Sequence, residues 1–84
     1  MTRTITLDLS GVTDKKALFE RLHTLLDFEG NNFDALHDAL GDIMKMTRIE
    51  VVGTSSIHEE FIGILTHVLA DSADENRKLS VLFR

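Results

Sequence analysis

The chain is organised around Asp27-Phe-Glu-Gly-Asn-Asn-Phe-Asp-Ala-Leu-His-Asp-Ala-Leu-Gly-Asp42, a stretch that we call the acidic segment. It holds five acidic residues and no lysine or arginine, whereas the whole chain has 14 Asp plus Glu against 9 Lys plus Arg. Outside the segment, nine acids therefore face nine bases, and the formal charge of -5 arises from the segment alone. We interpret it as a functional surface that faces a strongly basic partner and is held by a neutral scaffold.

Length and composition favour one small domain over residues 1–84. The absence of cysteine excludes disulfides and thiolate metal sites, and it favours a reducing cytoplasm. No apolar run approaches the ~20 residues of a membrane span, and the first residues lack the apolar centre of a signal peptide, so we expect a soluble cytoplasmic protein. Direct nucleic-acid binding is disfavoured because it depends on an excess of lysine and arginine.

Three segments alternate polar and apolar residues and predict strands at 4–9, 47–52 and 79–83. Their buried sides would carry the apolar residues Ile5, Leu7, Leu9, Ile49, Val51, Leu79, Val81 and Phe83. Apolar residues at helical spacing predict a helix up to about Leu26, with Phe19 at the edge of its apolar stripe. A second helix follows Asn31 or Asn32, and a third runs to about Asp71.

The ends of these helices carry capping signals. Thr13 or Asp14 is placed to cap the first helix, and Ser56 with Glu59 forms a capping box for the third. The order of elements is therefore β-α-α-β-α-β. Because helical crossovers join the strands, we expect an α/β fold of two layers, a parallel sheet with helices on one face.

The second helix has two different sides. Apolar residues share one side, namely Leu36, Ala39, Leu40 and Ile43. The opposite side carries Asp34, Asp38, Gly41 and Asp42, and Phe33 and His37 lie at the boundary. Asp34 and Asp38 are four residues apart, where like charges repel by a few tenths of a kcal/mol. Helix stability alone would not select that pair.

The acids of this helix face resemble two other kinds of site. Asp34 and Asp38 resemble a catalytic carboxylate pair of a small hydrolase, but both would share the same solvated surroundings. Asp34, His37 and Asp38 resemble a metal-ligand cluster, but His37 lies some 60° from Asp34 on a helical wheel. A further alternative is that this face is simply solvated and has no function. We therefore expect no catalytic residue, no metal and no cofactor.

The residues from Phe28 to Leu40 resemble the barstar family, the small cytoplasmic inhibitors of barnase-type ribonucleases. The family pattern has an aromatic residue, one further residue, Gly, then Asn, Asp-Ala-Leu and a second Asp. The matching positions here are Gly30, Asn32, Asp34, Ala35, Leu36, Asp38 and Leu40. The resemblance implies a sheet with strands in the order 1-2-3, in agreement with the two-layer prediction.

The resemblance implies that the protein is a ribonuclease inhibitor, which acts on one basic enzyme as an antitoxin or immunity protein. Asp38 would replace the substrate phosphate, Asp34 would engage a neighbouring base, and Phe28 would pack on the catalytic histidine of the enzyme. Barnase and barstar are themselves a standard example of electrostatically steered association and of an acidic hot spot. We apply the same physical reasoning to this chain and infer no affinity from them. The expected partner-binding residues are Phe28, Asn32, Phe33, Asp34, His37, Asp38, Gly41, Asp42, Ile43 and Asp71.

The chain also departs from the family pattern. Phe28 replaces a tyrosine, His37 stands where tryptophan is frequent, and Asp42 and Ile43 replace a glycine and an aromatic residue. A further acidic contact before the last strand corresponds to Asp71, with Asp74 or Glu75 as alternatives. The target therefore need not be barnase. The alternative function is a non-inhibitory acidic module that binds a basic regulatory protein.

Overall fold

A computed structural model describes residues 2–26 and 28–84 of the chain. Met1 and Asp27, the first residue of the acidic segment, lie outside the described residues. The elements are β1 (Arg3–Asp8), α1 (Lys15–Leu26), α2 (Phe33–Gly41), β2 (Thr47–Val52), the 3-10 turn η1 (Thr54–Ser56), α3 (Glu59–Glu75) and β3 (Leu79–Phe83). This succession confirms the predicted order of strands and helices.

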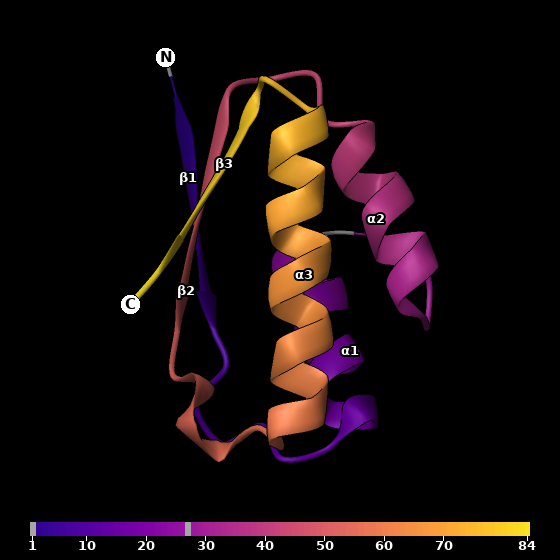
Figure 1. Cartoon of the computed structure of the whole chain (residues 1–84), viewed down its shortest axis with the longest axis vertical. Coiled ribbons are helices and arrows are strands. Elements are labelled where there is room, and N and C mark those ends of the chain that lie inside the picture. Colours follow the sequence, from indigo (N-terminus) through magenta and orange to yellow (C-terminus); the bar gives the residue numbers. More distant parts are fainter. Residues whose placement is uncertain (1, 27) are drawn as a thin grey trace.

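The three strands form one parallel sheet in the order β1-β2-β3. Ile49 is paired with Ile5 on one side and with Val81 on the other, so the apolar positions of the three strands are in register. The helices lie on one side of this sheet, with α1 behind α3 and α2 beside α3 on the side away from the strands (Figure 1). The predicted α/β architecture and strand order are confirmed.

The core lies between the sheet and the helices. Leu7, Ile49 and Val51 are fully buried on the covered side of the sheet, as their alternation predicts. They meet buried leucines of all three helices, namely Leu18, Leu22, Leu36, Leu40, Leu65 and Leu69. Phe83 lies on the same side of β3 but stays 39% exposed, because β3 is an edge strand and Phe83 is its last residue. No helix in the described part of the chain is long and apolar enough to cross a membrane.

Helix α1 begins after Asp14, whose Oδ1 accepts a hydrogen bond of 2.8 Å from the Ala17 N–H. This contact selects Asp14 over Thr13 as the capping residue. Phe19 was predicted at the edge of the apolar stripe, but its side chain is only 4% exposed. Its ring packs edge-to-face on Phe33, with centroids 5.1 Å apart, and this contact with α2 moves Phe19 into the core.

Two predictions about α3 were wrong. The capping box does not form, because Ser56 belongs to η1 and its hydroxyl donates to the Val12 carbonyl at 2.9 Å. His58 caps α3 instead, through a hydrogen bond of 3.2 Å from the Glu60 N–H to its Nδ1. The helix also continues to Glu75, one turn beyond the predicted end at Asp71. This added turn carries Ser72, a polar residue that is buried on the inward side of the helix.

Candidate functional site

Helix α2 is held in position by a capping residue at its N-terminus and by buried leucines on one side. The Asn32 side chain accepts a hydrogen bond of 2.8 Å from the Ala35 N–H, so Asn32, and not Asn31, is the N-cap. Leu36 and Leu40 are buried against the core. A helix fixed in this way leaves Asp34 and Asp38 exposed on its opposite side, as the wheel predicts.

Asn76 joins the end of α2 to the end of α3. Its Nδ2 donates to the carbonyl of Leu40 at 2.9 Å and to that of Ile43 at 3.1 Å. Asn76 is itself the C-cap residue of α3. The C-terminal ends of the two helices therefore meet at one end of the molecule, at the top of Figure 1.

Acidic side chains gather at this end. We call the acidic surface the exposed acids of this end together with Asp34, which extends the row to the first turn of α2; its members are Asp34, Asp38, Asp42, Asp71 and Glu75. A helix C-terminus has a partial negative charge and favours basic side chains, yet the last turns of α2 and α3 carry acids. Asp38 and Glu75 in these last turns oppose the dipoles of their helices and require another explanation, whereas Asp34 in the first turn of α2 favours the dipole of that helix.

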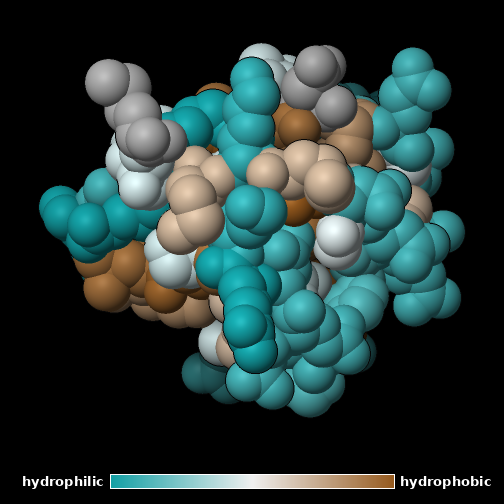
Figure 2. All heavy atoms as spheres, turned by 90° about the horizontal axis from the view of Figure 1, so that it is seen from above, coloured by the Kyte–Doolittle hydropathy of each residue, from teal (hydrophilic) through white to brown (hydrophobic). Residues whose placement is uncertain are grey.

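Figure 2 looks onto the same end, where hydrophilic side chains cover much of the surface and apolar groups show between them. Met44 and Met46, in the connection between α2 and β2, are 77% and 47% exposed. Exposed methionines beside charged groups give a partner an adaptable apolar contact. They were not among the predicted binding residues.

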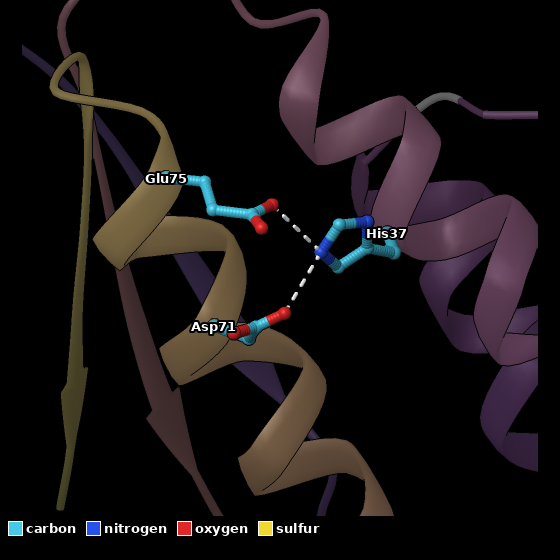
Figure 3. Close-up of side chains that lie close together, drawn as sticks. All are labelled: His37, Asp71 and Glu75. Carbon is cyan, nitrogen blue, oxygen red and sulfur yellow. Dashed lines mark hydrogen bonds and ion pairs between the residues drawn. The ribbon is translucent and has the colours of Figure 1, made fainter.

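His37 connects the two helices of the acidic surface. Its Nε2 lies 3.2 Å from Asp71 Oδ2 and 3.1 Å from Glu75 Oε2, both on α3 (Figure 3). The side chains are 34%, 48% and 61% exposed respectively. The ligand atoms of these three residues lie within 4.8 Å of one another, a spacing that could hold a metal ion. Within the described residues, the partners of His37 Nε2 thus come from α3 and not from Asp34 and Asp38, the pair considered with it in the sequence.

Phe28 is only half available to a partner. Its side chain is half-buried against the core and meets the His23 ring edge-to-face, with centroids 5.1 Å apart. The His23 ring nitrogen also bonds to the Gly30 carbonyl, which holds the loop against α1. The loop before α2 is therefore fixed by contacts to α1, and one part of the Phe28 ring remains at the surface.

The predicted binding residues fall into two groups. Asn32, Phe33 and Ile43 have structural contacts, since Asn32 caps α2, Phe33 packs on Phe19, and Ile43 packs against the core. The exposed group contains Asp34, Asp38, Gly41, Asp42 and Asp71, with half-buried His37 beside it. Glu75 belongs with the second group, although it was only an alternative in the sequence. Its four-residue spacing from Asp71 becomes informative once α3 is known to reach Glu75.

We expect Gly30→Ala to lower the free energy of unfolding by about 1–3 kcal/mol, as overpacking does in cores. A Cβ at Gly30 would come within 2.5 Å of the Ala35 Cβ and 3.2 Å of the Phe28 ring, so the loop or α2 must shift. Gly41→Ala is the matched control, because a Cβ there meets none of the described atoms within 4 Å. Urea denaturation of both variants measures the difference. Equal stability of the two variants would contradict the close approach at Gly30.

Comparison with known proteins gives one match. A sequence model of the family described as Barstar (barnase inhibitor) matches residues 2–84. No curated protein matches the chain.

Proposed function

The chain belongs to the barstar family of barnase inhibitors, and from this membership we propose that it blocks a basic ribonuclease by placing the acidic surface in the active site of that enzyme. Members of the family are inhibitors of barnase-type ribonucleases and not enzymes. The proposed role in the cell is that of an antitoxin or immunity protein, which acts in the cytoplasm on one toxin molecule at a time.

The observation that carries this proposal is the meeting of two helix C-termini at one end of the molecule, with the exposed acids Asp38, Asp42, Asp71 and Glu75 beside them. A ribonuclease binds the phosphates of its substrate with cationic side chains, and carboxylates of fixed position can replace those phosphates. Asp38 is the proposed phosphate substitute, and Asp34 engages a neighbouring base. Both side chains stand on a helix that is capped and packed, so little freedom is lost on binding.

The size of the molecule limits where such a partner binds. A standard interface buries roughly 800 Å² on each partner. The accessible surface of this chain is 5335 Å², so one interface uses about one end of the molecule. The acidic surface, exposed Met44 and the free part of Phe28 supply the charged and apolar contacts that an interface of this size needs.

The proposal is tested by recovering the protein from its native cells with its partners and identifying them by mass spectrometry. We expect a small basic ribonuclease, and we expect the purified protein to inhibit RNA cleavage by that enzyme at equimolar concentration. Recovery of a basic protein without nuclease activity would favour the alternative, an acidic module that binds a regulatory protein. Cleavage unaffected by the inhibitor would reject the proposed function.

The acidic surface should also steer the encounter, because opposite charges attract beyond contact distance and salt screens this attraction. We expect the association rate constant with the ribonuclease to fall about tenfold or more between low and high salt, as measured by stopped-flow fluorescence. Replacing Asp34 and Asp42 together by asparagine should flatten this dependence. Replacing Glu59 and Glu60 by glutamine, at the opposite end of α3, removes the same charge and should change it less. A salt-independent rate for the wild-type protein would remove the steering argument.

A further inference from the structure

His37, Asp71 and Glu75 bring one nitrogen and two oxygen donors together from two helices (Figure 3). We call these three residues the inter-helix cluster. Nε2 of His37 on α2 lies 3.2 Å from Asp71 Oδ2 and 3.1 Å from Glu75 Oε2, both on α3. The sequence predicted no metal site because it grouped His37 with Asp34 and Asp38, whereas the donors that meet its ring lie on α3.

Hydrogen bonds alone do not satisfy the inter-helix cluster. Each imidazole nitrogen carries at most one hydrogen, whatever the charge of the ring, so Nε2 donates fully to only one of the two carboxylates. Asp71 and Glu75 are also four residues apart on α3, where like charges repel. In the described part of the chain, their ion pairs are those with His37, and no lysine or arginine joins them. A divalent cation would satisfy all three donors at once.

The spacing and the chemical kind of the donors select among cations. A tetrahedral zinc ion with bonds of about 2.0–2.2 Å holds its ligand atoms about 3.3–3.6 Å apart. The two distances from His37 Nε2 lie within a few tenths of an ångström of this range. All three donor atoms are within 4.8 Å of one another, so movement of one exposed carboxylate completes the arrangement. An imidazole with two carboxylates suits zinc, whereas Ca²⁺ and Mg²⁺ take oxygen ligands.

We propose that the inter-helix cluster binds one Zn²⁺ ion, with His37 Nε2 and one oxygen each of Asp71 and Glu75 as its protein ligands and water in the fourth position. All three side chains are partly exposed, so the ion reaches them from solvent. The ion joins α2 to α3 close to the hydrogen bonds of Asn76. Since donors on two helices converge only in the folded chain, zinc binding stabilises the fold.

The test titrates Zn²⁺ alone into chelator-treated protein at pH 7.5, with isothermal calorimetry and thermal unfolding as readouts. We expect a single binding event and an unfolding midpoint that rises with zinc concentration. His37→Gln and Glu75→Gln should each weaken zinc binding at least about tenfold, because loss of even a hydrogen-bond partner of a ligand has an effect of this size. Ca²⁺ should bind at least about tenfold more weakly than Zn²⁺, because it gains little from an imidazole.

Two matched variants remove the same chemical groups from other positions. His67→Gln takes away an imidazole one turn before Asp71 on α3, and Glu59→Gln takes away an acid at the other end of that helix. Both should bind Zn²⁺ as the wild type does, and urea denaturation without metal checks that every variant is folded.

Three results would overturn the inference. The first is a wild-type protein that shows neither heat nor a shifted unfolding midpoint at any zinc concentration up to millimolar. The second is unchanged zinc binding by His37→Gln and Glu75→Gln. The third is an equal loss of binding in His67→Gln, which would place the ion on α3 alone. No ribonuclease enters these measurements, so they stand or fall separately from the proposed function.

Discussion

Asp38→Ala should weaken binding to the ribonuclease by about 2 kcal/mol or more, which is at least about thirtyfold in the dissociation constant. Asp38 is exposed in the middle of the acidic row of α2, one turn from Asp34 on one side and from Asp42 on the other. When its carboxylate is removed, cationic groups of the partner are left in the interface without an opposite charge. The free-energy cost of leaving these cationic groups unpaired is larger than the stabilisation that an exposed ion pair provides.

The same substitution should leave the fold intact. Asp38 lies near the C-terminus of α2 and between two like charges, so its removal relieves unfavourable interactions of a few tenths of a kcal/mol. Urea denaturation of the variant measures this directly. Glu59→Ala is the control for binding, because Glu59 lies in the first turn of α3, far from the acidic surface. If both variants bind the ribonuclease equally well, Asp38 has no special role.

Leu36→Ala should lower the free energy of unfolding by about 2–5 kcal/mol, the range found for buried leucines. Leu36 is fully buried on α2 and borders a small cavity of about 40 Å³ beside Leu40 and Ile43. Loss of the side chain enlarges a space that the surroundings have not closed. Small domains have only about 5–15 kcal/mol of stability in total, so the effect should be plain in a urea titration.

Leu82→Ala removes the same atoms from the uncovered side of β3, where Leu82 is 38% exposed. We expect it to reduce stability by less than about 1 kcal/mol. Because both variants lose the same atoms, the difference between their stabilities measures the effect of burial. A loss below 1 kcal/mol for Leu36→Ala would mean that α2 moves inward to fill the space, and the acidic surface would then not be rigidly held.

The fold could be predicted because most elements carry local signals that agree with their environment. The strands over residues 47–52 and 79–83 and the end of α1 at Leu26 match the sequence-based bounds. The end of α3 could not be predicted, because Ser72 is polar and its burial depends on tertiary packing. The cap of α3 was missed for a similar reason, since the turn η1 uses Ser56 for a distant contact with Val12.

The binding region was predictable where it depends on a single helix. The exposed side of α2 follows from the spacing of Asp34, Asp38 and Asp42, and all three are exposed. The residues that α3 adds to the binding region depend on how α2 and α3 pack together. The spacing of residues in the sequence does not reveal this packing. His37 shows this limit, because its partners Asp71 and Glu75 are more than 30 positions away.

The two hydrogen bonds of Asn76 have a consequence for the chemical ageing of the protein. Asparagine slowly loses its amide nitrogen in solution, and the product is a carboxylate that only accepts hydrogen bonds. At position 76 the lost group is the donor to the carbonyls of Leu40 and Ile43. A deamidated molecule would present oxygen to oxygen at the junction of α2 and α3, and both hydrogen bonds between the helix ends would be lost. One spontaneous reaction beside the acidic surface would thus limit how long the molecule keeps this end assembled.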